Sequence, residues 1–281
     1  MAEDMILSKG HQSVYFSGDS YNQQLAFLND TFVYVPEEPT PSNTPIVAKL
    51  DSLGKPLWAV SPPAGISGFD RNRSTIYIAK SPDEGVFTSW SENLYNGCSM
   101  EEHGRSLCFS MARYSPTGEQ QWLIQLPVRI EDPQKCKILQ LSANAHGHMV
   151  MGGYFYGRKI QIGPLELESV RSPAVFTLEF DADGQLLGGR TVDLAVQSAP
   201  PLTSAFFDLV LTEEGITYLC FGSDETVEIE PLCAVEPRFV QIAALRVTEG
   251  RILWERQFKG DGISRPTALA YGNNSLIHVA G

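Results

Sequence analysis

The chain has 281 residues, of which 43% are hydrophobic and 19% charged, so it is long and apolar enough to build a sizeable core. Its formal net charge of −12, without a local cluster of Lys and Arg, argues against nucleic acid as a partner. No stretch approaches the roughly 18 consecutive apolar residues that cross a bilayer, and the acidic start "MAEDMILSKGHQ" does not look like a signal peptide, so we expect neither membrane insertion nor a visible targeting signal.

The first 60 residues predict two β-hairpins separated by a long loop. Residues 5–18, "MILSKGHQSVYFSG", and residues 48–60, "AKLDSLGKPLWAV", each place apolar residues on both sides of a polar turn. The second turn ends in Gly54, as expected where a tight hairpin needs a positive φ. The intervening loop covers residues 29–45.

The second hairpin recurs three times, as "ARYSPTGEQQWLI" from residue 112, "LEFDADGQLLGGR" from 178 and "LRVTEGRILWERQ" from 245. The turn glycines are 64, 66 and 66 residues apart, at Gly54, Gly118, Gly184 and Gly250. Four residues after them stand Trp58, Trp122, Gly188 and Trp254. Because the tryptophans recur at one position, we expect them to pack between repeats rather than to form a stacking platform for a ligand.

Hairpins like residues 5–18 also recur, ending at Gly153, Gly222 and Gly281, with a degraded copy at residues 68–80. One repeat of about 65 residues therefore contains two hairpins, or four strands. Four-stranded units at such a period are typical of a β-propeller, in which each unit is one blade. We predict an all-β fold and a single β-propeller over residues 1–281, with units at 1–61, 62–127, 128–195 and 196–258 and a half unit at 259–281. A β-sandwich and a solenoid are the alternatives.

The first and last segments are both first hairpins of a repeat. The predicted propeller then has about four complete blades and half of a fifth, and we expect the chain to be a fragment of a larger propeller.

Two stretches are similar to a known family. "GGYFYGRKIQIGPLELESVRSPAVFTLEFDADGQLLGG" in the third unit and "PIVAKLDSLGKPLW" in the first resemble the bacterial β-propeller repeats often called SBBP-type. The second unit departs from that pattern by an insertion around Cys98 to Cys108, and Gly188 replaces the expected Trp. The resemblance implies a bacterial, extracytoplasmic propeller, and it implies little about activity because propellers host unrelated functions.

Three loops fall between the second and third strands of their units, at residues 29–45, 91–107 and 222–238. A propeller would gather them on one face, and loops on a rigid scaffold often mediate recognition. They contain many carboxylates and the aromatic residues Tyr34 and Tyr95. Ordinary solvated loops are the alternative interpretation.

Five cysteines are an odd number and too few for a disulfide scaffold of this size. Cys98 with Cys108, and Cys220 with Cys233, each flank a polar loop that a disulfide could close in an oxidising compartment. The alternative is free thiols, with Cys220 on a strand and the others in loops.

No pattern indicates a metal, a cofactor or a catalytic site. "DADG" at residues 181–184 lacks the further ligands of a calcium loop, so we expect a hairpin turn there. His146 and His148, with His103 or Cys136, contain metal-binding side chains but are explained by turn polarity. The common hydrolase, zinc-protease and nucleotide motifs do not occur.

These observations favour a non-enzymatic propeller scaffold that recognises a protein or a glycan through the loops of one face. One alternative is a polysaccharide hydrolase or lyase that uses carboxylates such as Asp208, Glu213 or Glu214 as acid and base. Another is a purely structural spacer module of a longer protein. The sequence leaves the oligomeric state open.

Overall fold

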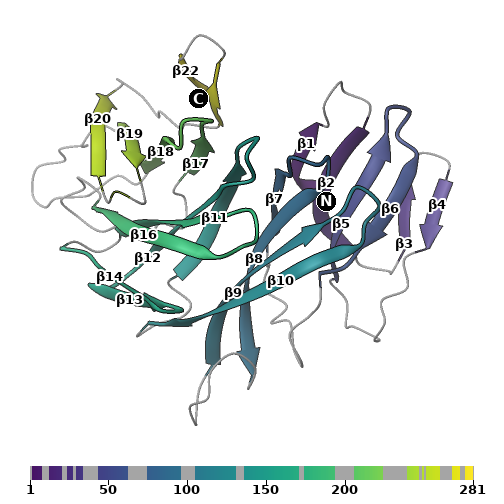
Figure 1. Ribbon diagram of the computed structural model, residues 1–281, viewed down its shortest axis with the longest axis horizontal. Helices are drawn as coiled ribbons and strands as arrows, with labels where there is room; N and C mark the ends of the chain where they lie inside the picture. The colour runs from purple at the N-terminus through teal and green to yellow at the C-terminus, as the bar shows by residue number, and fades with distance from the viewer. Residues whose placement is uncertain are drawn as a thin grey trace, which may run out of the picture. The chain divides into compact units, whose positions relative to one another are not determined.

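The computed structural model describes residues 2–7, 13–20, 24–27, 30–33, 44–62, 75–95, 105–130, 136–170, 174–193, 206–223, 239–246, 249, 251–259, 268–272 and 276–280. Throughout these ranges every regular element is a β-strand, which confirms the all-β prediction (Figure 1). The chain divides into two compact units. Unit 1 comprises Met1–Pro133 and Gln161–Pro164, and unit 2 comprises Gln134–Ile160 and Leu165–Gly281.

Unit 1 contains two main antiparallel sheets. Sheet I has the order β1-β2-β5-β6, and a small hairpin of β3 and β4 lies between β2 and β5 in the sequence. The strands of this part are β1 (Ala2–Leu7), β2 (Ser13–Ser20), β3 (Gln24–Phe27), β4 (Asp30–Val33), β5 (Thr44–Asp51) and β6 (Pro56–Val60).

Sheet II contains the consecutive strands β7 (Tyr77–Lys80), β8 (Val86–Tyr95), β9 (Arg105–Tyr114) and β10 (Gln120–Arg129). The end of β13 (Lys159–Ile162) also belongs to unit 1, where Gln161 and Ile162 pair with β10. The first hairpin of this sheet spans residues 77–95, so the predicted copy at residues 68–80 was placed too early.

Unit 2 contains two four-stranded antiparallel sheets and a hairpin. Sheet III has the order β11-β12-β15-β16, sheet IV has the order β17-β18-β19-β20, and β21 pairs with β22. The strands are β11 (Cys136–Ala143), β12 (Met149–Phe155), β14 (Leu165–Glu168), β15 (Ala174–Phe180), β16 (Leu186–Asp193), β17 (Phe206–Leu211), β18 (Thr217–Ser223), β19 (Phe239–Arg246), β20 (Arg251–Lys259), β21 (Ala268–Tyr271) and β22 (Ile277–Ala280).

One turn geometry closes hairpins in all four sheets. In the turn from Asp51 to Lys55, the Gly54 N–H donates to the Asp51 carbonyl, and Gly54 has a φ of 78°. The Asp51 carboxylate accepts the N–H groups of Leu53 and Lys55. This is a type I turn followed by a residue in the left-handed region, a common three-residue hairpin loop. The same backbone pattern closes the turns that begin at Ser81, Ser115, Asn144, Asp181 and Thr212.

The apolar cores lie between sheets inside each unit. Tyr15 and Trp58 of sheet I pack with Trp90 and Tyr114 of sheet II, and all four are buried. In unit 2, buried Val150 and Val175 of sheet III pack with leucines of sheet IV, and a second cluster joins Cys220 and Ile242 of sheet IV to Leu269 of β21. The strands thus follow the apolar alternation of the sequence, with their buried faces against the next sheet.

Candidate functional site

The three predicted recognition loops lie largely outside the described residues. Within residues 29–45 the structure places β4 and the start of β5, and Tyr34 lies outside the described part. The predicted loop at residues 91–107 was too wide, because β8 runs to Tyr95 and β9 begins at Arg105. Of the third loop, the structure describes only the end of β18, up to Ser223.

The hairpin turns show where these loops leave the sheets. In unit 1 the Trp58 indole N–H, beside the turn of sheet I, donates to the carbonyl of Pro116 in a turn of sheet II at 2.8 Å. In unit 2 the amide of Asn144 donates to the carbonyl of Thr212, so that turns of sheets III and IV also meet. Since strands alternate in direction, the connections between second and third strands leave from the other end of each sheet. Within each unit, therefore, these connections share one end.

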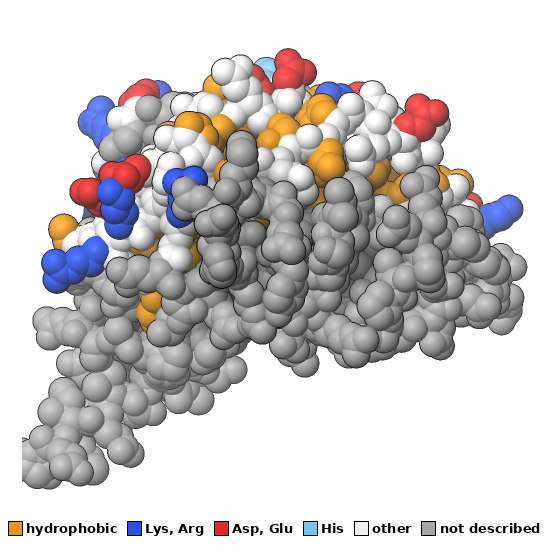
Figure 2. Space-filling view, turned by 90° about the horizontal axis from the view of Figure 1, so that it is seen from below, with side chains coloured by type: hydrophobic (Ala, Val, Ile, Leu, Met, Phe, Trp, Pro, Cys, Tyr) orange, Lys and Arg blue, Asp and Glu red, His pale blue; other side chains and the backbone are white. Residues whose placement is uncertain are grey.

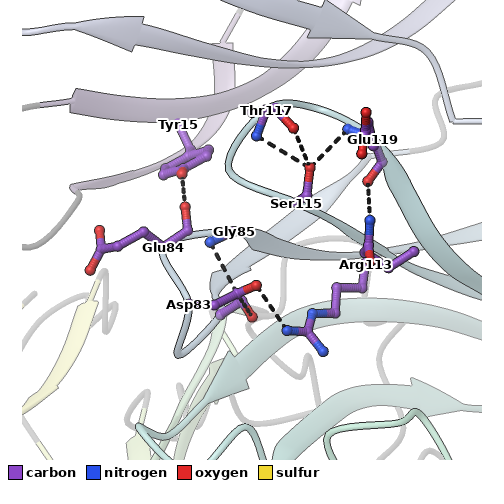
Figure 3. Close-up of polar contacts among 10 residues, drawn as sticks. Tyr15, Asp83, Glu84, Gly85, Arg113, Ser115, Thr117 and Glu119 are labelled. Carbon is purple, nitrogen blue, oxygen red and sulfur yellow. Dashed lines mark hydrogen bonds and ion pairs between the residues drawn. The ribbon is translucent and has the colours of Figure 1, made fainter.

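A polar cluster that the sequence did not predict joins the two sheets of unit 1 (Figure 3). Tyr15 of β2 donates its hydroxyl proton to the backbone carbonyl of Glu84, in the first turn of sheet II. The Lys49 ammonium lies 4.9 Å from the centroid of the Tyr15 ring. Burial, followed by the charges of Glu84 and Asp83, raises the pKa of Tyr15, so the hydroxyl stays protonated and remains a donor.

Charged side chains extend this cluster along sheet II. Arg113 forms an ion pair with Asp83 at 3.0 Å, and Lys80 forms one with Glu84 at 2.9 Å. Burial alone would raise the pKa of Asp83, but hydrogen bonds from Ser81 and the Gly85 N–H, together with Arg113, hold that pKa below its usual value. The cluster therefore has structural partners for its charges, and its chemistry is that of an interface between sheets.

Glu84 occupies the position that glycine holds in the other turns. Its φ is 64°, in the left-handed region that side chains other than glycine rarely adopt. The missing glycine explains why the hairpin at residues 77–95 was not found in the sequence.

The tryptophans have different surroundings, although they share one position. Trp58 is buried and packs on Gly118, where an added β-carbon would lie 2.9 Å from the indole ring. Trp122 stacks on Phe87 with ring centroids 5.9 Å apart. Trp254 is 36% exposed and contacts Tyr218. Packing is confirmed for Trp58, whereas Trp254 leaves one face open.

The proposed acid Asp208 lies between three strands of unit 2. Its Oδ1 accepts the side-chain amide of Gln140 on β11 at 2.9 Å, and its Oδ2 accepts the Leu269 N–H on β21 at 2.7 Å. Oδ1 also accepts the N–H of Leu209. Both oxygens are thus engaged in holding neighbouring strands, and a general acid or base needs an oxygen that can reach a substrate.

Glu213 and Glu214 lie in the turn between β17 and β18. The Glu213 carboxylate accepts the Ala145 N–H from the turn of sheet III, and it lies 3.9 Å from His146 Nε2. A hydrogen bond from Thr212, the largest effect, lowers the pKa of Glu214. A general acid in glycoside cleavage needs a raised pKa. The structure therefore brings Glu213 to a contact between turns and gives Glu214 an unsuitable protonation state for an acid.

Other candidates have structural explanations. The Asp181 carboxylate accepts the N–H groups of Asp183 and Gln185, so "DADG" is a hairpin turn, as predicted. His146 and His148 donate their backbone N–H groups to the Asn144 side chain. His103 lies outside the described residues. Among the residues that the structure describes, no group of three or more His, Cys, Asp or Glu side chains is arranged to hold a metal ion.

The cysteines divide into bonded and free. Cys108 is disulfide-bonded, and its partner lies outside the described residues. Cys220 is a free, buried thiol, so the considered bond between Cys220 and Cys233 is wrong. Cys136 is also free and buried. Both Cys108 and Cys136 lie on strands, β9 and β11, rather than in loops as expected.

The described surface shows charges of both signs. On the face drawn in Figure 2, Lys and Arg side chains lie among Asp and Glu side chains, with apolar side chains between them. In the described ranges, no helix has the length and apolar character needed to span a membrane.

Comparison with known proteins adds no family assignment. No protein-family model and no curated protein matches this chain.

Proposed function

We propose that the chain is a β-propeller scaffold, similar to the bacterial SBBP-type repeats, that recognises a protein or glycan ligand through the loops of one face. The observation that carries this proposal is the contact between first strands of consecutive sheets. In unit 1, β1 lies against β7, and in unit 2, β11 lies against β17 and β17 against β21. Blades that surround a central axis bring their first strands together in this way.

The shared end of the second-to-third strand connections supports a recognition face. Residues 224–238 contain five Asp or Glu residues and one Arg, and residues 96–104 contain Glu101 and Glu102. Acidic loops on a rigid scaffold favour a ligand with basic groups or with many hydroxyl donors, such as a basic protein surface or a glycan.

A non-enzymatic function is supported by the use of the candidate carboxylates. Asp208 and Glu213 accept hydrogen bonds from neighbouring strands and turns. These contacts explain both residues without a substrate.

We also propose an extracytoplasmic location. The disulfide at Cys108 supports it, since structural disulfides persist in oxidising compartments and are rare in the cytosol of most organisms.

Loop replacement tests the recognition proposal. The purified chain is applied to a glycan microarray and, in parallel, used in pull-down with extracts of bacterial envelope proteins. Residues 34–43, 96–104 and 224–238 are then each replaced by a short Asn-Gly turn, singly and together. We expect the wild-type chain to bind a defined ligand and the replacements to weaken that binding at least tenfold.

The matched control is Leu53→Ser. Leu53 is 84% exposed in the turn at the opposite end of sheet I, so this change alters an exposed apolar side chain away from the loops. Binding that survives replacement of all three loops contradicts the proposal. So does a ligand whose binding is lost in Leu53→Ser but not in the loop variants.

A further inference from the structure

An aromatic row with an open outer end crosses sheet IV and the hairpin of β21 and β22, all inside unit 2. The Trp254 and Tyr218 rings are 5.9 Å apart, and Tyr218 stacks on Tyr271 at 5.6 Å with 18° between the planes. Trp254 on β20 is 36% exposed and Ile252 on the same strand is 38% exposed. A surface of exposed Trp and Ile next to a short sheet is a candidate interaction site.

The sheet of β21 and β22 also has an open edge in the described part of the chain. β22 pairs with β21, and Val279 on β22 is 39% exposed. An unpaired strand edge presents N–H and C=O groups to any strand that can add to it. The exposed indole and the strand edge therefore belong to one surface of unit 2.

Sheet I shows what a tryptophan at this position binds. Trp58 lies opposite Lys49 on the neighbouring strand, and Trp254 lies opposite Ala244 at the corresponding place on sheet IV. The turn that begins at Ser115 covers Trp58, which is only 8% exposed. That turn supplies the Pro116 carbonyl to the indole N–H and the flat backbone of Gly118 to the ring face.

We propose that Trp254 and the edge of β22 bind a β-hairpin supplied by a partner polypeptide. The hairpin has a turn of the form Ser/Asp-x-x-Gly. The carbonyl of its second turn residue accepts the Trp254 indole N–H, its glycine lies on the indole ring, and its first strand pairs with β22. This inference deepens the proposed function, because the bound hairpin makes β21 and β22 into a four-stranded sheet like the others.

Other occupants fit the surface less well. A glycan stacks on aromatic faces, but it leaves the strand edge of β22 unpaired. A second copy of the chain has a turn of the right form at Asp51–Lys55. That turn belongs to sheet I, whose own first and second strands would need the place that β21 and β22 already occupy.

A synthetic hairpin tests the proposal. The peptide contains residues 107–126, which form a Trp-binding turn in this chain, with Cys108→Ser and Trp122→Phe and a fluorescein label. Its fluorescence polarisation is titrated with the full chain. We expect saturable binding that weakens at least about tenfold in Trp254→Ala and about fivefold in Trp254→Phe, which keeps a ring but loses the indole N–H.

Two controls separate this contact from general stickiness. Leu57→Ala removes an apolar side chain that is 53% exposed on the outer strand of sheet I, and we expect it to leave the peptide affinity unchanged. A peptide with Gly118→Val cannot easily adopt the φ of 89° that the turn needs, so we expect it to bind at least about tenfold more weakly.

Several results would overturn the proposal. They are no binding of the peptide by the wild-type chain at millimolar concentration, equal binding by Trp254→Ala, and displacement of the peptide by glycans. Self-association of the wild-type chain that is lost in Trp254→Ala would assign the surface to a second copy instead. The loop-replacement variants retain the Trp254 surface and should bind the peptide normally, so failure of loop recognition is distinguishable from failure here.

Discussion

Glycine at the fourth turn position meets two separate requirements in this chain. At Gly215 the φ is 73° and nothing lies within 4 Å of an added β-carbon, so only the backbone conformation requires glycine. At Gly118 the φ is 89° and an added β-carbon would also meet the Trp58 ring at 2.9 Å. The same residue type thus serves the turn in one sheet, and both the turn and the contact between sheets in another.

Substituting alanine at both positions separates these requirements. We expect Gly215→Ala to lower the free energy of unfolding by about 1 kcal/mol, through backbone strain alone. Gly118→Ala should cost about 1 to 3 kcal/mol more, because Trp58 must also shift in a packed interior. Urea unfolding followed by circular dichroism measures both changes.

The background variant Trp58→Ala checks the assignment. Without the indole ring, the extra cost of Gly118→Ala should disappear and the two alanine variants should become equivalent. An extra cost that persists would show that the ring contact is not its cause.

Among the elements, the first strands of unit 2 are joined through one carboxylate. Asp208 on β17 accepts hydrogen bonds from Gln140 on β11 and from Leu269 on β21. Hydrogen bonds to a charged acceptor are roughly twice as strong as neutral ones. Because three separate strands depend on this group, a change at Asp208 should be felt at β21 as well as at β11.

Asp208→Asn tests that dependence. The amide keeps one oxygen, but its NH2 group then faces either the Gln140 amide or the Leu269 N–H, and two donors cannot bond. We expect a loss of about 1 to 3 kcal/mol in the free energy of unfolding and faster hydrogen exchange at the Leu269 amide. Asp183→Asn, in an exposed turn, is the matched control and should change neither value. An unchanged exchange rate at Leu269 in Asp208→Asn would contradict the role assigned to this carboxylate.

The hairpins with glycine turns were predictable, and the contacts between sheets were not. Gly54 and Gly118 mark their turns because few other residues accept a positive φ, whereas Glu84 adopts the same conformation without a sequence signal. The contact between Tyr15 and Glu84 joins residues that are 69 positions apart, and no local pattern connects them.

One signal could have located these contacts. The pairs Gln140 with Asp208 and Asn144 with Thr212 are each 68 residues apart, close to the spacing of the turn glycines. Polar residues separated by one such spacing are therefore candidates for contacts between consecutive sheets. The acidic loops remain a prediction, because residues 96–104 and 224–238 lie outside the described part of the chain.

At the scale of the whole molecule, the cysteines report both folding and compartment. Cys108 is disulfide-bonded, while Cys136 and Cys220 are free and buried. Burial raises the pKa of Cys136, and burial followed by the charge of Asp208 raises the pKa of Cys220 to about 12. A protonated, buried thiol is a poor nucleophile.

Thiol titration checks this arrangement. Because one intrachain disulfide takes two of the five cysteines, we expect three reactive thiols when the oxidised chain is unfolded in guanidinium without reductant. In the native protein at pH 8, Cys136 and Cys220 should not react on the same time scale. Five thiols in the unfolded, unreduced protein would show that the disulfide does not form.

Buried groups with raised pKa values should make the whole fold sensitive to alkali. The unfolded state releases the Cys220 proton near the ordinary value of about 9, whereas the folded state holds it until about 12. Between these values the unfolded state binds fewer protons, so the free energy of unfolding falls as the pH rises, by at most about 1.4 kcal/mol per pH unit for each such group. Burial also raises the pKa of Tyr154 to about 12, which adds to the decline above pH 10.

Urea unfolding at pH 8 and pH 10.5 in wild type and Cys220→Ala measures this decline. Cys220→Ala should be less stable than wild type at pH 8, because a side chain is removed from a packed cluster, but its stability should fall less between the two pH values. The Asp208 carboxylate beside Cys220 is ionised throughout this range and contributes equally at both pH values, so the difference in slope isolates the thiol. Equal slopes in the two proteins would mean that Cys220 titrates alike in the folded and unfolded chain, and that sheet IV is open to water at this position.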